Sequence, residues 1–126
     1  MQDFHNLKVW QKAHRLVLAV YEATERFPPE ERFGLTSQIR RAGVSIPANI
    51  AEGRARQGDG EFRHFLNVAY GSAAEVEYLL FLARDLGFLE NGQHDAIAAN
   101  VDEVKGMLSA FIRRLATGGR KLQADG

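Results

Sequence analysis

Apolar residues recur at intervals of three and four along four stretches of the chain, and no stretch alternates apolar and polar residues as a strand does. This periodicity predicts amphipathic helices over about 7–26, 36–53 and 59–87, and a fourth helix that follows a turn at Asn91-Gly92. Short connections between long helices favour antiparallel neighbours. The pattern therefore predicts an all-α fold, namely an up-and-down antiparallel four-helix bundle.

Residues that start or stop helices stand at the expected boundaries. Phe27-Pro28-Pro29 should end the first helix, because each proline lacks an amide hydrogen and restricts the residue before it. We expect one helical turn in the connector that follows, ending at Gly34. Thr36 and Asp59 are the expected N-caps of the second and third helices, and Gly87 is the expected left-handed C-cap of the third.

Each predicted helix carries one main apolar stripe, and together these stripes predict the core. The stripe of the third helix alternates by four and three residues without a break, as a heptad repeat does. The residues expected in the core are Val9, Trp10, Ala13, Leu16, Val17, Val20, Tyr21 and Thr24; Leu35, Ile39, Ala42, Ile46 and Ile50; Phe62, Leu66, Ala69, Ala73, Val76, Leu80 and Ala83; and Ile97, Val101, Val104, Leu108, Phe111 and Leu115.

A proline lies inside the second helical pattern, in the segment FGLTSQIRRAGVSIPANIAEG over 33–53. Pro47 removes the backbone hydrogen bond to the carbonyl of Gly43, at a cost of about 3 kcal/mol for a proline inside a helix. We therefore expect the second helix to be kinked at Pro47.

Two of the predicted helices are apolar on more sides than one bundle core requires. The second helix has an additional small stripe, and the third is apolar almost all the way round at Tyr78-Leu79-Leu80-Phe81-Leu82. Large exposed apolar patches mark interaction sites, so we expect a homo-oligomer. The alternative is that the third helix is simply the most buried helix of a monomer. The residues expected at the oligomer interface are Val44, Ala48, Ala51, Tyr78, Phe81 and Leu82.

The composition fits a single small domain. The chain has 126 residues, of which 45% are hydrophobic, so we expect one domain over 1–117 and a flexible tail over 118–126. It has no cysteine, which excludes disulfides and thiolate metal sites. Neither a signal peptide nor an apolar run of membrane-spanning length is recognisable, and a cytoplasmic location is the expectation.

The formal net charge is zero, with 16 basic and 16 acidic residues, which weighs against a generic nucleic-acid-binding protein. The charges are unevenly spread: residues 1–58 hold nine Lys and Arg against six Asp and Glu, whereas residues 59–90 hold two against six. Lys8, Lys12 and Arg15 share one helix face at a spacing that suits a phosphate backbone. Arg40 and Arg41 are adjacent and so must point in different directions.

No pattern in the chain indicates catalysis or a bound metal. Glu61-Phe62-Arg63-His64 has the Glu-x-x-His spacing of di-iron bundles, but such a site needs the motif twice and further carboxylates. Ser45, Asn49 and Glu52 share one face of the second helix, yet no histidine or elbow motif accompanies them. We expect a protein that is not an enzyme and has no cofactor.

The sequence resembles a known family, the small bacterial four-helix-bundle proteins encoded within intervening sequences of 23S rRNA genes. The similarity includes FHNLKVWQKAHRLVLAVYEAT, FGLTSQIRRAGVSIPANIAEG and EFRHFLNVAYGSAAEVEYLL, with a less distinctive fourth helix. The resemblance implies a four-helix protomer that assembles into a ring, namely a homopentamer. It also implies kinship with the accessory protein of diversity-generating retroelements, a basic pentamer that binds reverse transcriptase and nucleic acid.

Two functional hypotheses follow. The first is a ring-forming protein that binds structured RNA or a ribonucleoprotein through basic side chains, namely Lys8, Lys12, Arg15, Arg40 and Arg41. The second is an oligomeric protein–protein interaction scaffold without nucleic acid, in which Arg40 and Arg41 form ion pairs with Glu52 or with the acidic third helix of a neighbour. The first requires the two arginines on one exposed face of the ring, and the second requires them at the joints between subunits.

Overall fold

Four long helices packed side by side make up the protein. The computed structural model describes the backbone of residues 3–125 and the side chains of residues 3–117. The helices are α1 (Lys8–Thr24), α2 (Leu35–Ala55), α3 (Asp59–Asp85) and α4 (Asn91–Asp125). Two short 3-10 helices, η1 (Phe4–Asn6) and η2 (Pro29–Glu31), precede α1 and α2. The described backbone contains no strand, so the expected all-α class is confirmed.

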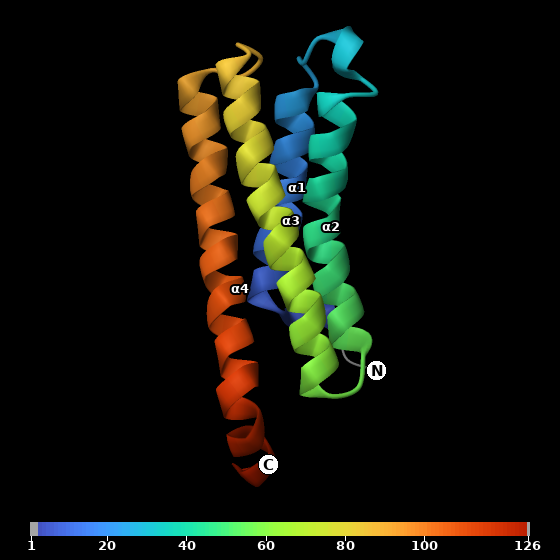
Figure 1. Ribbon diagram of the computed structural model, residues 1–126, viewed down its shortest axis with the longest axis vertical. Helices are drawn as coiled ribbons and strands as arrows, with labels where there is room; N and C mark the ends of the chain where they lie inside the picture. Colours follow the sequence, from blue (N-terminus) through green and yellow to red (C-terminus); the bar gives the residue numbers. More distant parts are fainter. Residues whose placement is uncertain (1–2, 126) are drawn as a thin grey trace.

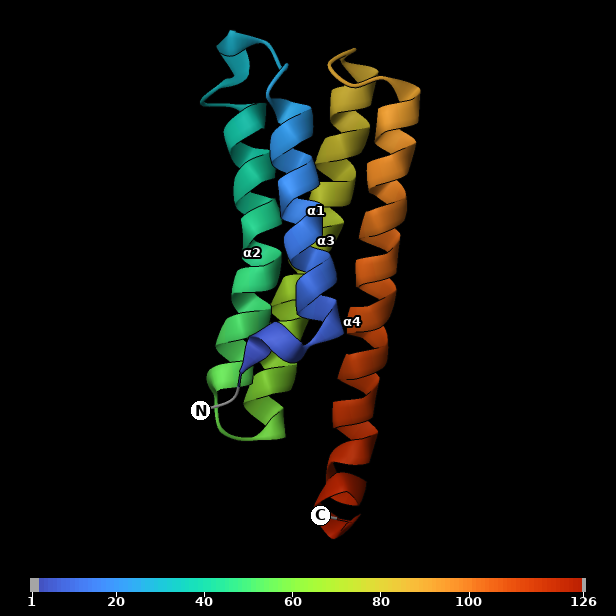
Figure 2. The ribbon, with the colours of Figure 1, turned by 180° about the vertical axis from the view of Figure 1, so that it is seen from behind.

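Consecutive helices run antiparallel, and α1 also packs against α4, so that the bundle closes on itself. The α1–α2 connector and the α3–α4 turn lie at one end of the bundle (Figure 1). Viewed from behind, η1 crosses the opposite end between α2 and α1, and α4 continues past the α2–α3 turn (Figure 2). This arrangement is the expected up-and-down four-helix bundle.

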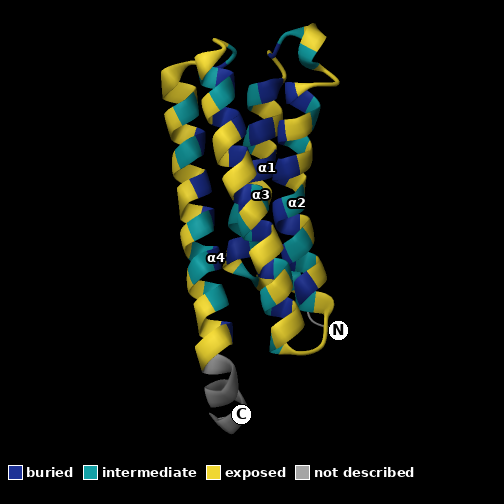
Figure 3. Ribbon diagram, viewed as in Figure 1, coloured by how far each residue is buried: buried dark blue, intermediate teal, exposed yellow. Residues whose placement is uncertain are grey.

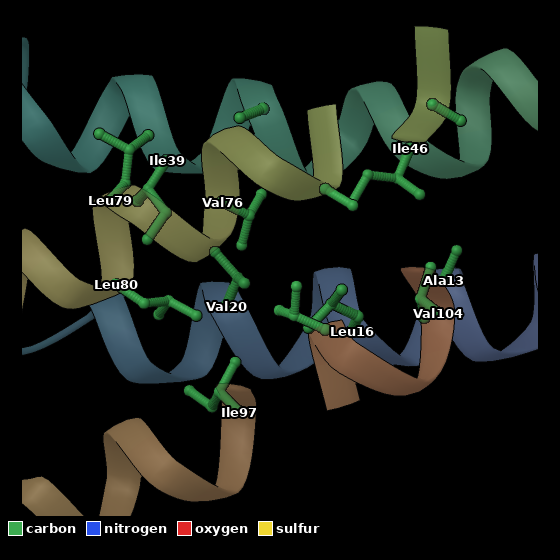
Figure 4. Close-up of a cluster of buried hydrophobic side chains, with 14 of the residues drawn as sticks. Ala13, Leu16, Val20, Ile39, Ile46, Val76, Leu79, Leu80, Ile97 and Val104 are labelled. Atoms are coloured by element: carbon green, nitrogen blue, oxygen red, sulfur yellow. The ribbon is translucent and has the colours of Figure 1, made fainter. Parts of the chain in front are cut away.

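The predicted stripes form the core almost without exception. The third-helix seam is buried throughout, and the side chains of Leu16, Ile39, Ile46, Leu66 and Leu108 are 0–1% exposed. Buried positions follow the inner sides of all four helices (Figure 3), and their side chains meet on the bundle axis (Figure 4). Trp10 and Phe111 are only half-buried against this core, and Tyr21 lies at the bundle surface with 41% of its area exposed.

The expected cap at Thr36 is wrong. The N-cap of helix α2 is Gly34, two residues earlier, and Thr36 is buried inside the first turn. The reason is that Glu31 folds back from η2, and its carboxylate accepts a hydrogen bond from the backbone N–H of Leu35 at 2.9 Å. A side chain from outside the helix thus satisfies an end group that a capping threonine would otherwise satisfy.

The other boundaries of the first three helices differ from the expected ones by one or two residues, whereas Asn91 and Gly92, expected to form a turn, open α4, and the backbone of α4 continues to Asp125. Asp59 is the first residue of α3 instead of its N-cap, which is Gly58, and its carboxylate still lies where the helix dipole favours it. Gly87 has φ of +82° and ends α3 as expected: the N–H of Phe88 bonds to the carbonyl of Ala83, and that of Gly87 to Arg84.

Two expectations about the chain's shape stay predictions. Helix α2 runs through the buried Pro47 as one helix from Leu35 to Ala55, and the kink remains to be measured. The flexible tail expected over 118–126 falls largely outside the described side chains, while the backbone of α4 continues to Asp125.

Gly53 lies where α2 and α3 approach each other closely. A β-carbon added there would lie 2.7 Å from Phe65 Cβ, closer than real contacts allow, and 3.0 Å from Phe62 Cδ1, tighter than most real contacts. Gly71 on α3 offers a matched comparison, because a β-carbon added there would have no neighbour within 4 Å.

We therefore expect Gly53→Ala to lower the free energy of unfolding by about 1–3 kcal/mol, the usual effect of overpacking. Gly71→Ala should instead leave it unchanged or raise it by about 0.5–1 kcal/mol, because alanine is the better helix former. Urea unfolding followed by circular dichroism measures both. Equal effects of the two substitutions would contradict the close α2–α3 contact.

Candidate interaction surfaces

The basic face of α1 is partly engaged with α4. Lys8 and Arg15 are exposed, whereas Lys12 lies with its Nζ 3.3 Å from Glu103 Oε1. Such surface pairs stabilise by about 0–1 kcal/mol, so Lys12 can exchange this partner for another. Lys8 and Arg114 line one groove between α1 and α4, which adds a basic residue that the pattern on α1 alone did not indicate.

Arg40 is held by the end of α1. Its Nε donates a hydrogen bond to Thr24 Oγ1 at 2.8 Å, and an Nη donates to the carbonyl of Tyr21 at 3.3 Å. Its guanidinium lies 4.5 Å from the centre of the Tyr21 ring. The last carbonyls of a helix lack intrahelical partners and carry a partial negative charge. Arg40 therefore stabilises the α1–α2 contact within the protomer.

Arg41 points to a different groove. It lines a cavity of about 550 Å³ between α2 and α3, together with Ser37, Gln38 and Glu75. Within the described side chains it makes no ion pair, and Glu52, one of its expected partners, binds Arg56 at 2.8 Å. The adjacent arginines thus face different helices: Arg40 faces α1 and Arg41 faces α3.

The five basic candidates consequently occupy three separate inter-helix grooves of the protomer. The α1 residues lie toward α4, Arg40 lies between α1 and α2, and Arg41 lies between α2 and α3. A single protomer does not gather them on one face.

Three of the apolar candidates are prominent on the surface. Val44 is 42% exposed, Tyr78 59% and Phe81 48%. Ala48 is exposed as well, and Ala51 and Leu82 are half-buried. Leu79, which also widened the apolar arc of the third helix, is buried in the bundle. The bundle core therefore accounts for only part of the extra apolar surface.

The polar residues that share the α2 face bond to each other and to α3. The hydroxyls of Ser45 and Ser72 lie 2.8 Å apart, and the side chain of Asn49 donates to the carbonyl and hydroxyl oxygens of Ser45 at 2.7 and 2.9 Å. No histidine contacts this set among the described residues. Glu61 and His64 are exposed, and no three potential metal ligands gather anywhere in the described part of the chain.

Phe33 is a prominent surface residue that the periodicity missed. It precedes Gly34 in the connector and is 87% exposed, the highest value among the large apolar side chains. The sequence feature that could have predicted this exposure is a large aromatic residue outside every predicted apolar stripe.

The fold also separates charge along the bundle axis. The end with the α1–α2 connector and the α3–α4 turn comprises residues 22–33 and 84–95, which hold seven Asp and Glu against three Lys and Arg. The opposite end comprises residues 3–11, 52–63 and 111–117, with six basic against four acidic residues. A net charge of zero therefore conceals one acidic end.

Among the described side chains, two ionisable groups have shifted pKa values, and both shifts come from local contacts. The hydrogen bond from Lys105 to Glu77, at 2.7 Å, raises the pKa of the Lys105 ammonium above 10.5. The hydrogen bond from the backbone N–H of His5 lowers the pKa of Asp3 below 3.8. Neither shift moves a group into the range of a general acid or base near neutral pH.

In the described part of the chain, no helix is both long enough and apolar enough to cross a membrane.

The different positions of the two arginines lead to a stability prediction. Arg40→Ala should lower the free energy of unfolding by about 1 kcal/mol, because it removes two hydrogen bonds at the end of α1. Arg41→Ala should change it by less than about 0.5 kcal/mol. Parallel urea titrations compare them, and an equal loss for both variants would contradict the separate positions described above.

Comparison with known proteins agrees with this geometry. A model of the family described as 23S rRNA-intervening sequence protein matches residues 5–110. Among solved structures, the chain is similar to a protein of unknown function from the S23 ribosomal protein family of Bacteroides thetaiotaomicron, with 28% sequence identity and a TM-score of 0.78. The similarity covers 83% of this chain and 95% of that one. No curated protein matches. Because the family model spans most of the bundle, the chain belongs to the 23S rRNA-intervening sequence protein family.

Proposed function

We propose that this protein is a non-enzymatic scaffold that assembles with copies of itself and binds other macromolecules as an oligomer. The observation that carries the proposal is the exposed apolar surface on α2 and α3, where Val44, Tyr78 and Phe81 remain 42–59% exposed. Side chains of this size stabilise a complex by about 1.5–3 kcal/mol each when fully buried relative to full exposure. A monomer that leaves them in water forgoes part of that energy.

Several features support an assembled form over a catalytic one. The hydroxyls and amide on the α2–α3 side are occupied by mutual hydrogen bonds, which leaves no activated nucleophile among them. The ring-shaped homopentamer and the kinship with retroelement accessory proteins, both implied by the family resemblance, belong to this proposal. The expected cytoplasmic location is part of this proposal as well.

Assembly is tested by placing a charge on the apolar face. We expect the combined variant Val44→Asp/Phe81→Asp to be folded and monomeric at micromolar concentration, because assembly would bury two unpaired carboxylates. Ala99→Asp, an exposed alanine on α4, is the matched control and should keep the wild-type mass. Multi-angle light scattering gives the masses. A wild-type protein that is monomeric at these concentrations would refute the scaffold.

Binding of structured RNA is the second candidate, and the exposed basic residues near the start of α1 favour it. Lys8, Arg15 and Arg114 are all exposed, and the acidic end of the bundle lies away from Lys8 and Arg114. Around a closed ring such a patch is repeated, and multivalency raises the avidity without new contacts. Arg40 contributes little in this reading, since α1 already holds its guanidinium.

The RNA candidate predicts that nuclease-treated protein binds a labelled rRNA fragment with an affinity that falls steeply between about 50 and 200 mM salt. Lys8→Ala/Arg15→Ala should lower the slope of log K against log salt by about two per protomer bound to phosphate. Arg26→Ala, which removes a charge at the acidic end, is the control and should leave the slope unchanged. Absence of binding at 50 mM salt would exclude this candidate and leave the protein scaffold.

A further inference from the structure

Phe33 is held outward by an ordered connector. The N–H of Gly34 bonds to the carbonyl of Glu31 at 2.9 Å, and the Glu31 side chain accepts from Leu35 at 2.9 Å, so the backbone on both sides of Phe33 is tied to η2. The Arg32 guanidinium lies 5.0 Å from the centre of the Phe33 ring. The result is an aromatic projection from an ordered backbone, with a positive charge beside it. Phe33 is 87% exposed and stands at the edge of the cavity between α2 and α3 of its own protomer.

A cavity at the same end of the bundle has the complementary character. It lies between α1 and α4, has a volume of about 440 Å³, and is lined on its apolar side by Ala19, Ala23, Ala96 and Ile97. The cavity exists because three of these residues are alanines, whose methyl groups leave the space between the two helices unfilled. Glu22 and Glu25 lie on its rim and make no ion pair among the described side chains, and Arg26 offsets one of their two charges.

We propose that Phe33 of one protomer inserts into the α1–α4 cavity of a second copy of this chain. The phenyl ring would leave water for an alanine-lined space, and Arg32 would come beside the carboxylates of Glu22 and Glu25. The proposal rests on self-assembly as proposed above and adds a second contact on a different surface from Val44 and Phe81. Neither contact alone holds the assembly together at micromolar concentration, so the loss of either one gives monomers.

The positions of the two surfaces determine the kind of assembly. The connector that holds Phe33 projects beyond α1 and α2, while the cavity opens on the other side of α1, toward α4, at the same end of the bundle (Figure 2). A contact between two unlike surfaces is heterologous, so each protomer has one projection and one cavity to offer. Side-by-side copies in the same orientation satisfy both, and repetition closes into a ring when the rotation permits.

This geometry is tested with one variant that lacks the projection and one that fills the cavity. Phe33→Asp removes the aromatic ring, and Ala96→Trp fills the cavity from an exposed position on α4. Ala99→Trp places the same side chain elsewhere on α4 and serves as the control. Circular dichroism and thermal unfolding of each variant verify the fold. We expect both test variants to weaken self-association at least tenfold in analytical ultracentrifugation, whereas the control should not.

Mixing the two variants gives the decisive result. Phe33 of the Ala96→Trp chain meets an intact cavity on the Phe33→Asp chain, while the other three pairings are blocked. We expect the mixture to form a one-to-one heterodimer with close to wild-type affinity per joint. Wild-type assembly in both single variants, or no heterodimer on mixing, would overturn the proposal.

Charge reversal supplies an independent variant pair. Arg32→Glu should weaken association, and Glu22→Arg/Glu25→Arg in the second chain should restore it. If Val44→Asp/Phe81→Asp abolishes assembly but none of these variants does, this inference fails while the proposed scaffold stands. A monomeric wild-type protein would end both.

Discussion

Helix α3 packs closely against α2 and α4, and this close packing determines how those two helices are positioned. The middle of its seam consists of Ala69, Ala73 and Val76, all fully buried, and Gly53 on α2 meets the side chains of Phe62 and Phe65 without a β-carbon between them. Small residues at facing positions allow the helices to approach, and dense packing then penalises any change of volume. Because α3 fixes its two neighbours, it also decides which residues of α2 and α4 reach the surface.

The same close packing explains most of the polar residues on α2. Ser45 and Asn49 lie where α2 meets α3, and their hydrogen bonds with each other and with Ser72 satisfy polar groups that would otherwise be desolvated unpaired. Arg40 does the equivalent for the end of α1. Many residues of the segment over 33–53 therefore make structural contacts within the protomer, while Phe33, Arg41 and Val44 are among those that face outward.

What remains on the surface favours contacts between macromolecules. The apolar side chains on α2 and α3, the projection at Phe33 and the cavity between α1 and α4 are unlike one another, which suits joints between different faces of neighbouring copies. The charge distribution would also orient a bound RNA relative to the bundle, because the acidic residues gathered at one end repel its phosphates. The assembly and the RNA binding proposed above would thus use different parts of the protomer and are physically compatible.

The sequence by itself determined the four helices, their antiparallel order and nearly all of the core. Apolar residues at 3.6-residue spacing share one face of a helix, and the fold has to bury that face. Gly87 as a helix end followed for the same local reason: glycine adopts the left-handed conformation easily. Thr36 was misjudged as a cap because Glu31 reaches the helix end from outside it. Tertiary structure alone decided that Arg40 binds α1 while Arg41 faces α3, that Leu79 is buried while Phe33 is exposed, and that a neutral chain has an acidic end. Each of these depends on which helices become neighbours, and spacing along one helix does not contain that information.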